Sequence, residues 1–141
     1  MRVVIDRSVL VAAIRSPTGA SMELLRLALD EHIELLISTA LVLEYEAVLT
    51  RPEQLRVSNL SLHDIDFLLN DICNVATEMI IHWQWRPQLT DADDEMVLET
   101  AINGRADAIV TFNTGDFARS ATRFGIAVLL PGDALSRLEN S

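Results

Sequence analysis

The chain opens with MRVVID (residues 1–6), and this stretch indicates the fold class. Residues 3–5 form a short β-branched apolar run, which is typical of a strand buried on both faces within a parallel sheet. Asp6 follows that run directly. Ligands of open parallel sheets bind beyond the carboxyl ends of the strands, so we expect Asp6 to lie at a functional edge. The alternative is that Asp6 only caps the next helix.

Strand and helix patterns alternate along the rest of the chain. Such alternation implies right-handed crossovers and a parallel sheet covered by helices on both faces. At 141 residues the chain fits a single domain. We therefore predict one α/β domain over residues 1–141, a three-layer α/β/α fold with a central parallel sheet. Further strands are expected at 33–37, 77–81, 108–111 and 126–129. Helices are expected at 9–14, 21–31, 39–50 and 61–75, after the acidic run 91–95 up to about residue 103, at 114–119, and from 131 onward.

Composition limits the classes of function. The net charge is -10, which argues against a broad positive surface for nucleic acid. All 11 basic residues are Arg, whose planar fork matches phosphate oxygens. The only cysteine, Cys73, excludes an intramolecular disulfide and a cysteine-rich zinc site, and it fits a cytoplasmic protein. No apolar run approaches the roughly 18 residues of a membrane span, so no membrane association is expected.

Several polar side chains are predicted to converge at one edge of the sheet. Carboxylates brought close together repel one another, so such a cluster usually holds a cation. Oxygen ligands suit Mg²⁺ or Mn²⁺, which polarise a phosphate and acidify a bound water. The pattern therefore predicts phosphodiester hydrolysis. The candidates are Asp6, Glu44, Asp91, Asp93, Asp94, Asn113 and Asp116.

Each candidate also has a purely structural interpretation. Glu44 is an ordinary helix residue, and the acidic run at 91–95 suits the positive N-terminus of a helix. Asp116 is in a position to cap the short helix after the fourth predicted strand. The functional interpretation therefore depends on the convergence of all these residues at one edge.

Four segments that contain these acids resemble the PIN domain, in particular the VapC toxins of toxin–antitoxin pairs. The resemblance covers nearly the whole chain and implies a Rossmann-like α/β/α fold. It also implies Mg²⁺- or Mn²⁺-dependent cleavage of RNA, a homodimer, and inhibition by a small antitoxin protein. The segments are VVID (3–6), STALVLEYEAVL (38–49), DADD (91–94) and VTFNTGDF (110–117).

The resemblance assigns the acidic metal site to Asp6, Glu44, Asp94 and Asp116, with Asn113 beside the last. Asp94 is preferred to its neighbours because it stands seven residues before Ala101, the spacing of the family's third motif. In this assignment Asp91 and Asp93 are outer ligands.

The chain departs from the family pattern beside the first acid and in the fourth motif. Arg7 and Ser8 stand where the family commonly has Thr or Ala and then Asn. Arg7 either contacts phosphate or competes with the metal, and Ser8 can donate a hydrogen bond to a carboxylate. Asn113 replaces a common Asp and lowers the negative charge. These departures keep open a catalytically weakened domain that binds RNA or protein.

Other classes of function are less consistent with the residues. Receiver domains and haloacid dehalogenase-type phosphatases both need a Lys, which this chain lacks, and the phosphatases need a second Asp where Ser8 stands. His32, His63 and His82 show no metal-ligand spacing. Trp83 and Trp85 either stack an unpaired base or pack against the domain or a partner.

Overall fold

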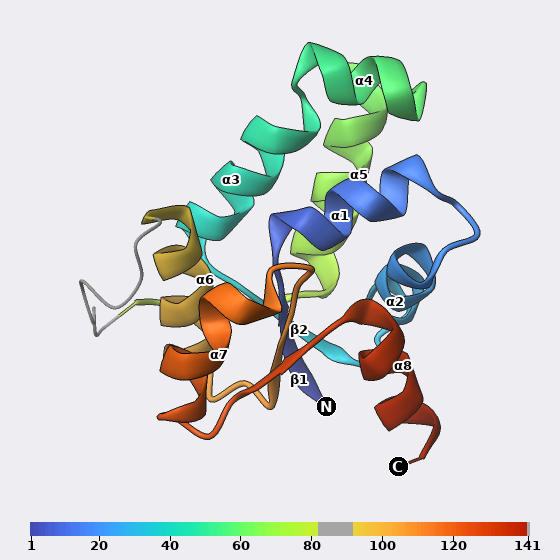
Figure 1. Ribbon diagram of the computed structural model, residues 1–141. Helices are drawn as coiled ribbons and strands as arrows, with labels where there is room; N and C mark the ends of the chain where they lie inside the picture. The colour runs from blue at the N-terminus through green and yellow to red at the C-terminus, as the bar shows by residue number, and fades with distance from the viewer. Residues whose placement is uncertain (82–91, 141) are drawn as a thin grey trace.

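The fold is built around five parallel strands (Figure 1). The structure is a computed structural model that describes residues 1–81 and 92–140. The strand order is β3-β2-β1-β4-β5, so β1 lies at the centre, as the sequence predicts. The third strand is shorter than its expected range. The strands are β1 (Arg2–Ile5), β2 (Glu34–Ile37), β3 (Thr77–Glu78), β4 (Ala108–Val110) and β5 (Ala127–Leu129).

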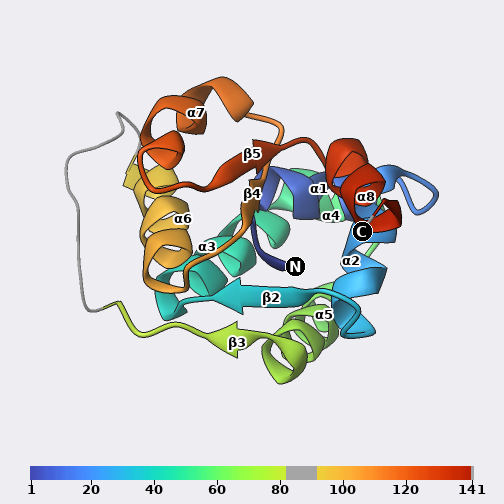
Figure 2. The ribbon, with the colours of Figure 1, turned by 90° about the horizontal axis from the view of Figure 1, so that it is seen from below.

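Helices cover both sides of this sheet (Figure 2). Helices α1, α2 and α8 pack together on one side, and α6 and α7 pack together on the other. The three-layer α/β/α prediction is confirmed. The helices are α1 (Arg7–Arg15), α2 (Ala20–Leu29), α3 (Thr39–Leu49), α4 (Pro52–Ser58), α5 (Leu62–Val75), α6 (Ala92–Asn103), α7 (Thr114–Thr122) and α8 (Pro131–Glu139).

The sequence analysis did not expect helix α4. It treated Pro52 as the end of α3, but Pro52 begins a new helix at its first position. Proline suits that position because its fixed φ is helical and its missing N–H is not needed there. Helix α5 begins with a capping box, in which Ser61 and Asp64 each accept a hydrogen bond from the other's backbone N–H.

The central strand is buried as its sequence predicts. Val3, Val4 and Ile5 are at most 1% exposed, and they pack within one hydrophobic core. The register pairs Ile5 with Val110 of β4. Because parallel neighbours that pair at their last residues end at the same edge, the residues that follow β1 and β4 lie side by side. The packing of the core therefore determines where Asp6 and the residues after β4 lie.

Several sequence-based interpretations fall on residues 82–91, outside the described residues. They concern His82, both tryptophans, and Asp91. The side chain of Asp93, at the start of α6, is likewise not described. Within the described part of the chain, no helix is both long enough and apolar enough to cross a bilayer.

Gly104, which follows α6, is required by a close approach to the sheet. A Cβ added there would lie 2.6 Å from Leu36 Cδ1 and 2.9 Å from Met79 Sδ. Leu36 is completely buried, so a shift of its side chain would have to take place within the core. The sequence analysis would treat this glycine only as a helix stop, whereas the structure makes it a packing requirement.

We therefore expect Gly104→Ala to lower the free energy of unfolding by about 1–3 kcal/mol, the usual cost of overpacking a core. Chemical denaturation monitored by circular dichroism would measure the loss. Gly132→Ala is the control, because an added Cβ at Gly132, which lies in α8, meets no atom within 4 Å. Equal stability of the two variants would contradict the packing argument.

Candidate functional site

Asp6 lies at the carboxyl end of β1 and is almost completely buried, with 1% of its surface exposed. It occupies the N-cap position of α1, but its side chain makes no capping hydrogen bond. Its Oδ2 instead accepts hydrogen bonds from Ser8 Oγ and Thr111 Oγ1, each at 2.8 Å. Oδ1 accepts no hydrogen bond from any described residue. The side chain is therefore oriented by its neighbours and does not cap α1.

The neighbours of Asp6 stabilise its charge without cancelling it. Burying a carboxylate in an apolar core is costly, and two hydroxyl donors offset part of that cost. Neither Ser8 nor Thr111 carries a positive charge, so these two donors do not form an ion pair with Asp6. An oriented carboxylate with one oxygen left for another ligand fits a hard divalent cation, which prefers oxygen donors.

A hydrogen bond from Tyr45 of α3 holds the end of β1 in place. Its hydroxyl donates to the backbone carbonyl oxygen of Ile5, the residue before Asp6. Burial raises the pKa of Tyr45, and the nearby charge of Asp6 raises it further. The phenol therefore stays protonated and keeps donating this bond.

The loop after β4 is tied to the same carboxylate. The backbone N–H of Phe112 donates to Ser8 Oγ at 3.2 Å, and that of Asn113 donates to Thr111 Oγ1 at 3.0 Å. Thr111 is fully buried and joins the loop to Asp6. The sequence analysis did not single out Thr111. The available signal was a hydroxyl residue directly after a buried strand that neighbours β1.

Arg7 and Glu44 form an ion pair next to Asp6. Arg7 Nη1 donates to Glu44 Oε1 at 3.2 Å, and the two side chains are 25% and 16% exposed. Arg7 begins α1, and Glu44 lies on α3, which packs against α1. Glu44 is thus held by a cation that belongs to the protein itself.

Helix α6 packs against β1 and β4 and carries three buried carboxylates. Asp94 is 4% exposed, and so is Glu99, while Glu95 is 3% exposed; all three make polar or electrostatic interactions. The helix packs against β1, β4, α3 and α7. Buried acids are uncommon because of their desolvation cost, and they cluster at functional sites. Sequence analysis proposed Asp94 but missed Glu95 and Glu99, because acidic residues look ordinary in a helix.

Asp116 and Asn113 are exposed at the start of α7. The backbone N–H of Asp116 donates to the carbonyl oxygen of Asn113 at 3.1 Å. Among the described residues, no group of three or more acidic, His or Cys side chains is arranged to hold a metal ion. The structure therefore brings Asp6 together with Ser8 and Thr111, and Arg7 together with Glu44. It does not gather Asp6, Glu44, Asp94 and Asp116 into one complete ligand set.

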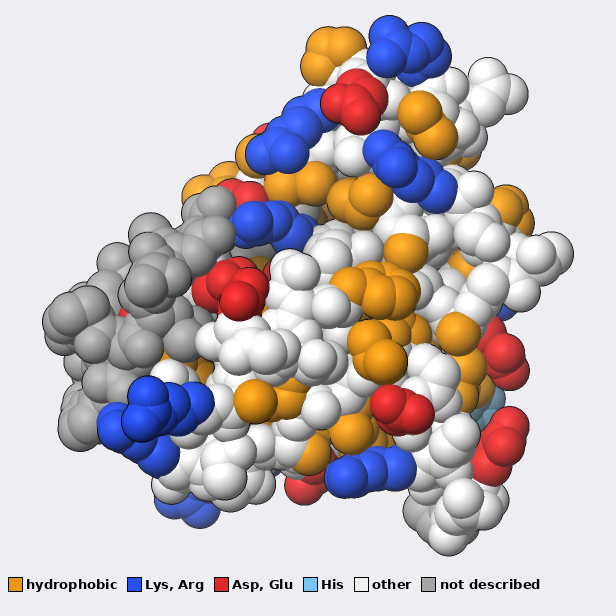
Figure 3. All heavy atoms as spheres, in the orientation of Figure 1, with side chains coloured by type: hydrophobic (Ala, Val, Ile, Leu, Met, Phe, Trp, Pro, Cys, Tyr) orange, Lys and Arg blue, Asp and Glu red, His pale blue; other side chains and the backbone are white. Residues whose placement is uncertain are grey.

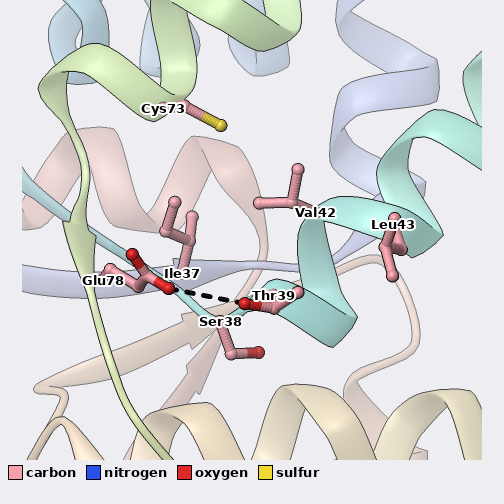
Figure 4. Close-up of a pocket in the computed structure, with 7 residues that line it drawn as sticks. All are labelled: Ile37, Ser38, Thr39, Val42, Leu43, Cys73 and Glu78. Carbon is pink, nitrogen blue, oxygen red and sulfur yellow. Dashed lines mark hydrogen bonds between the residues drawn. The ribbon is translucent and has the colours of Figure 1, made fainter.

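A separate pocket of about 210 Å³ opens between α3, the end of α5 and β3 (Figure 4). Two of its lining residues are joined by a hydrogen bond, in which Thr39 Oγ1 donates to Glu78 Oε1 at 3.4 Å. No residue proposed for the acidic site lines this pocket. The full lining is Ile37, Ser38, Thr39, Val42, Leu43, Cys73 and Glu78.

Comparisons with solved structures find the same fold. VapBC2 from Rickettsia felis, bound to a DNA fragment from its promoter, aligns with a TM-score of 0.62 and 13% identity over 91% of this chain and 97% of that chain. VapBC-1 from nontypeable Haemophilus influenzae gives 0.62 and 9% identity over 94% and 99%. FitAB bound to an IR36 DNA fragment gives 0.60 and 19% identity over 92% and 94%.

A family model supplies a sequence-based match in addition to these structural ones. No curated protein matches the chain significantly. The model of the PIN domain, however, matches residues 2–115, a range that includes Asp6, Glu44 and Asp94 and ends one residue before Asp116. The match covers most of the chain and confirms the resemblance seen in its motifs. The chain therefore belongs to the PIN-domain family.

Proposed function

We propose that this protein is a metal-dependent endoribonuclease that hydrolyses phosphodiester bonds of RNA. The observation that carries the proposal is the state of Asp6, a buried and oriented carboxylate with Oδ1 free of hydrogen bonds from described residues. It lies at the carboxyl edge of the central strand, where parallel α/β sheets bind ligands. Membership of the PIN-domain family supports nuclease chemistry at this edge.

The residues of the site suit Mg²⁺ or Mn²⁺. Asp6 and the buried Asp94 are the principal candidate ligands, and Asp116 and Glu44 complete the set that the family resemblance implies. A bound divalent ion supplies positive charge for the scissile phosphate and lowers the pKa of a water molecule. Ser8 and Thr111 fix the orientation of Asp6, a role that commonly strengthens metal binding.

RNA binding would depend on local contacts. On the face shown in Figure 3, several arginine side chains gather over the upper part, around α4 and α1, with acidic side chains between and below them. The chain as a whole carries a net charge of -10. The fixed charge of a metal site, together with nearby arginines, would then attract the phosphate backbone.

The structural neighbours suggest the biological setting. Their names, VapBC and FitAB, are those of two-component complexes, and two of the three are bound to DNA. We propose that this chain is the toxin of a toxin–antitoxin pair, that a small antitoxin protein inhibits it, and that it acts in the cytoplasm as a homodimer.

A second candidate function is a PIN-like domain that binds RNA or protein without cutting it. Two observations favour it: Arg7 neutralises Glu44, and an exposed Asn113 stands where relatives often have Asp. Both reduce the negative charge that would attract a metal. Divalent-ion binding and RNA cleavage distinguish the two candidates.

Purified protein free of antitoxin is expected to cleave single-stranded RNA with Mn²⁺ or Mg²⁺, and EDTA is expected to stop the reaction. Asp6→Asn should lower the rate at least about a hundredfold, because metal catalysis supplies several kcal/mol of transition-state stabilisation. Gel analysis of labelled RNA measures both effects. Asp71→Asn, an exposed acid on α5, is the control. Cleavage that persists in EDTA, or normal cleavage by Asp6→Asn, would refute the mechanism.

Thr111→Val is expected to reduce cleavage about 10- to 100-fold, because a hydroxyl that orients a metal ligand is lost while the side-chain volume is kept. It should also lower the free energy of unfolding by about 1 kcal/mol, since a buried hydrogen bond is removed. Thr111→Ser retains the hydroxyl and should keep most of the activity. If Val and Ser variants cleave equally well, the hydrogen bond to Asp6 has no positioning role.

A further inference from the structure

The ion pair between Arg7 and Glu44 is well placed to act on the acidic site. Arg7 directly follows Asp6 in the chain, and the pair joins α1 to α3 with Nη1 and Oε1 3.2 Å apart. Both side chains are largely shielded from water, at 25% and 16% exposure. Shielded charges interact more strongly than charges at the surface, so this pair resists separation more than an exposed one would.

Two other Arg–Glu pairs provide a comparison. Arg2 and Glu34 lie 3.4 Å apart at the amino ends of β1 and β2, with side chains 38% and 43% exposed. Arg15 and Glu53 lie 3.9 Å apart and are 38% and 71% exposed. The pair next to Asp6 is the shortest and the most shielded of these three. We therefore expect this pair to be more stable than an incidental contact between exposed side chains.

Arg7 and Glu44 differ in how they would affect a bound metal, because the charge of arginine is permanent. Arginine stays protonated at any physiological pH, so the charge of Arg7 cannot be titrated away. A divalent cation that used Glu44 as a ligand would have to displace the guanidinium or lie close to it. Asp6, by contrast, accepts its side-chain hydrogen bonds from the neutral hydroxyls of Ser8 and Thr111.

We propose that Arg7 is a built-in counter-ion that withholds Glu44 from the metal and lowers the affinity of the site for divalent cations. The proposal rests on the proposed function, because it concerns the same metal site. It removes Glu44 from the four ligands that the family resemblance implies. Arg7 is then a positioning residue that acts on the metal through Glu44.

The test is Mn²⁺ binding to antitoxin-free protein without RNA, measured by calorimetry and by electron paramagnetic resonance of free Mn²⁺. Arg7→Gln should bind Mn²⁺ at least about tenfold more tightly, because the positive charge that is paired with Glu44 is lost. Glu44→Gln should weaken Mn²⁺ binding less in the wild type than in the Arg7→Gln background, because Glu44 is withheld from the metal while Arg7 is present. The double variant Arg7→Gln/Glu44→Gln should return to the wild-type affinity.

Two further variants control for folding and for general charge effects. Arg7→Lys keeps the positive charge and should retain the wild-type affinity. Arg2→Gln removes a guanidinium from the matched pair at the opposite end of β1 and should leave Mn²⁺ binding unchanged. Thermal unfolding of each variant identifies any loss of structure, and Arg7→Lys with Glu44→Gln carries the test if Arg7→Gln fails to fold.

The remaining outcomes separate this inference from the proposed function. Unchanged or weaker Mn²⁺ binding by folded Arg7→Gln, with normal binding by the wild type, overturns the inference alone. If Glu44→Gln weakens binding in the wild type as much as in Arg7→Gln, or more, the inference is also overturned, because Glu44 would then be a ligand even beside Arg7. Binding that occurs only in Arg7→Gln supports the inference. Absence of Mn²⁺ binding in both the wild type and Arg7→Gln overturns the metal site and the inference together.

Discussion

The site depends on the pairing of β1 with β4. The register that pairs Ile5 with Val110 sets Asp6 and Thr111 next to each other, although 105 positions separate them in sequence. Both strands are almost completely buried, so a slip of one residue would turn core side chains to the wrong face. Hydrophobic packing therefore fixes the register, and the register fixes the hydrogen bonds that orient Asp6. The geometry of the acidic edge follows from the core.

Much of the fold could be predicted because its signals are local. The apolar run at residues 3–5 indicated the central strand, and the capping box at Ser61 marked the start of α5. Pro52 misled the sequence analysis, since proline ends one helix and also suits the first position of another. The length of β3 was not predictable either: Ile80 is apolar but 69% exposed, and an edge strand has a neighbour on one side only.

The candidate site was predictable only in part, because its contacts join distant segments. The sequence suggested Asp6 by its position after a buried strand, but it left capping and ligand binding as equal alternatives. The structure separates them, since the side chain bonds to Ser8 and Thr111 and makes no capping bond. The role of Thr111 depends on the strand register, and the partner of Arg7 depends on how α1 packs against α3. Neither can be deduced from local pattern.

Asp6 and Glu44 have different kinds of hydrogen-bond donor as partners. Hydroxyl groups orient Asp6 and leave its charge intact, whereas a guanidinium neutralises Glu44. Several unpaired carboxylates at one edge would repel one another and raise the pKa of some of them. Protonated carboxylates would weaken a metal site at neutral pH. Neutralising one acid relieves that repulsion, but it also removes a ligand. In the proposed metal site, the identity of residue 7 would set a balance between the stability of the metal-free site and its affinity for metal, and arginine would favour the stability of the metal-free site.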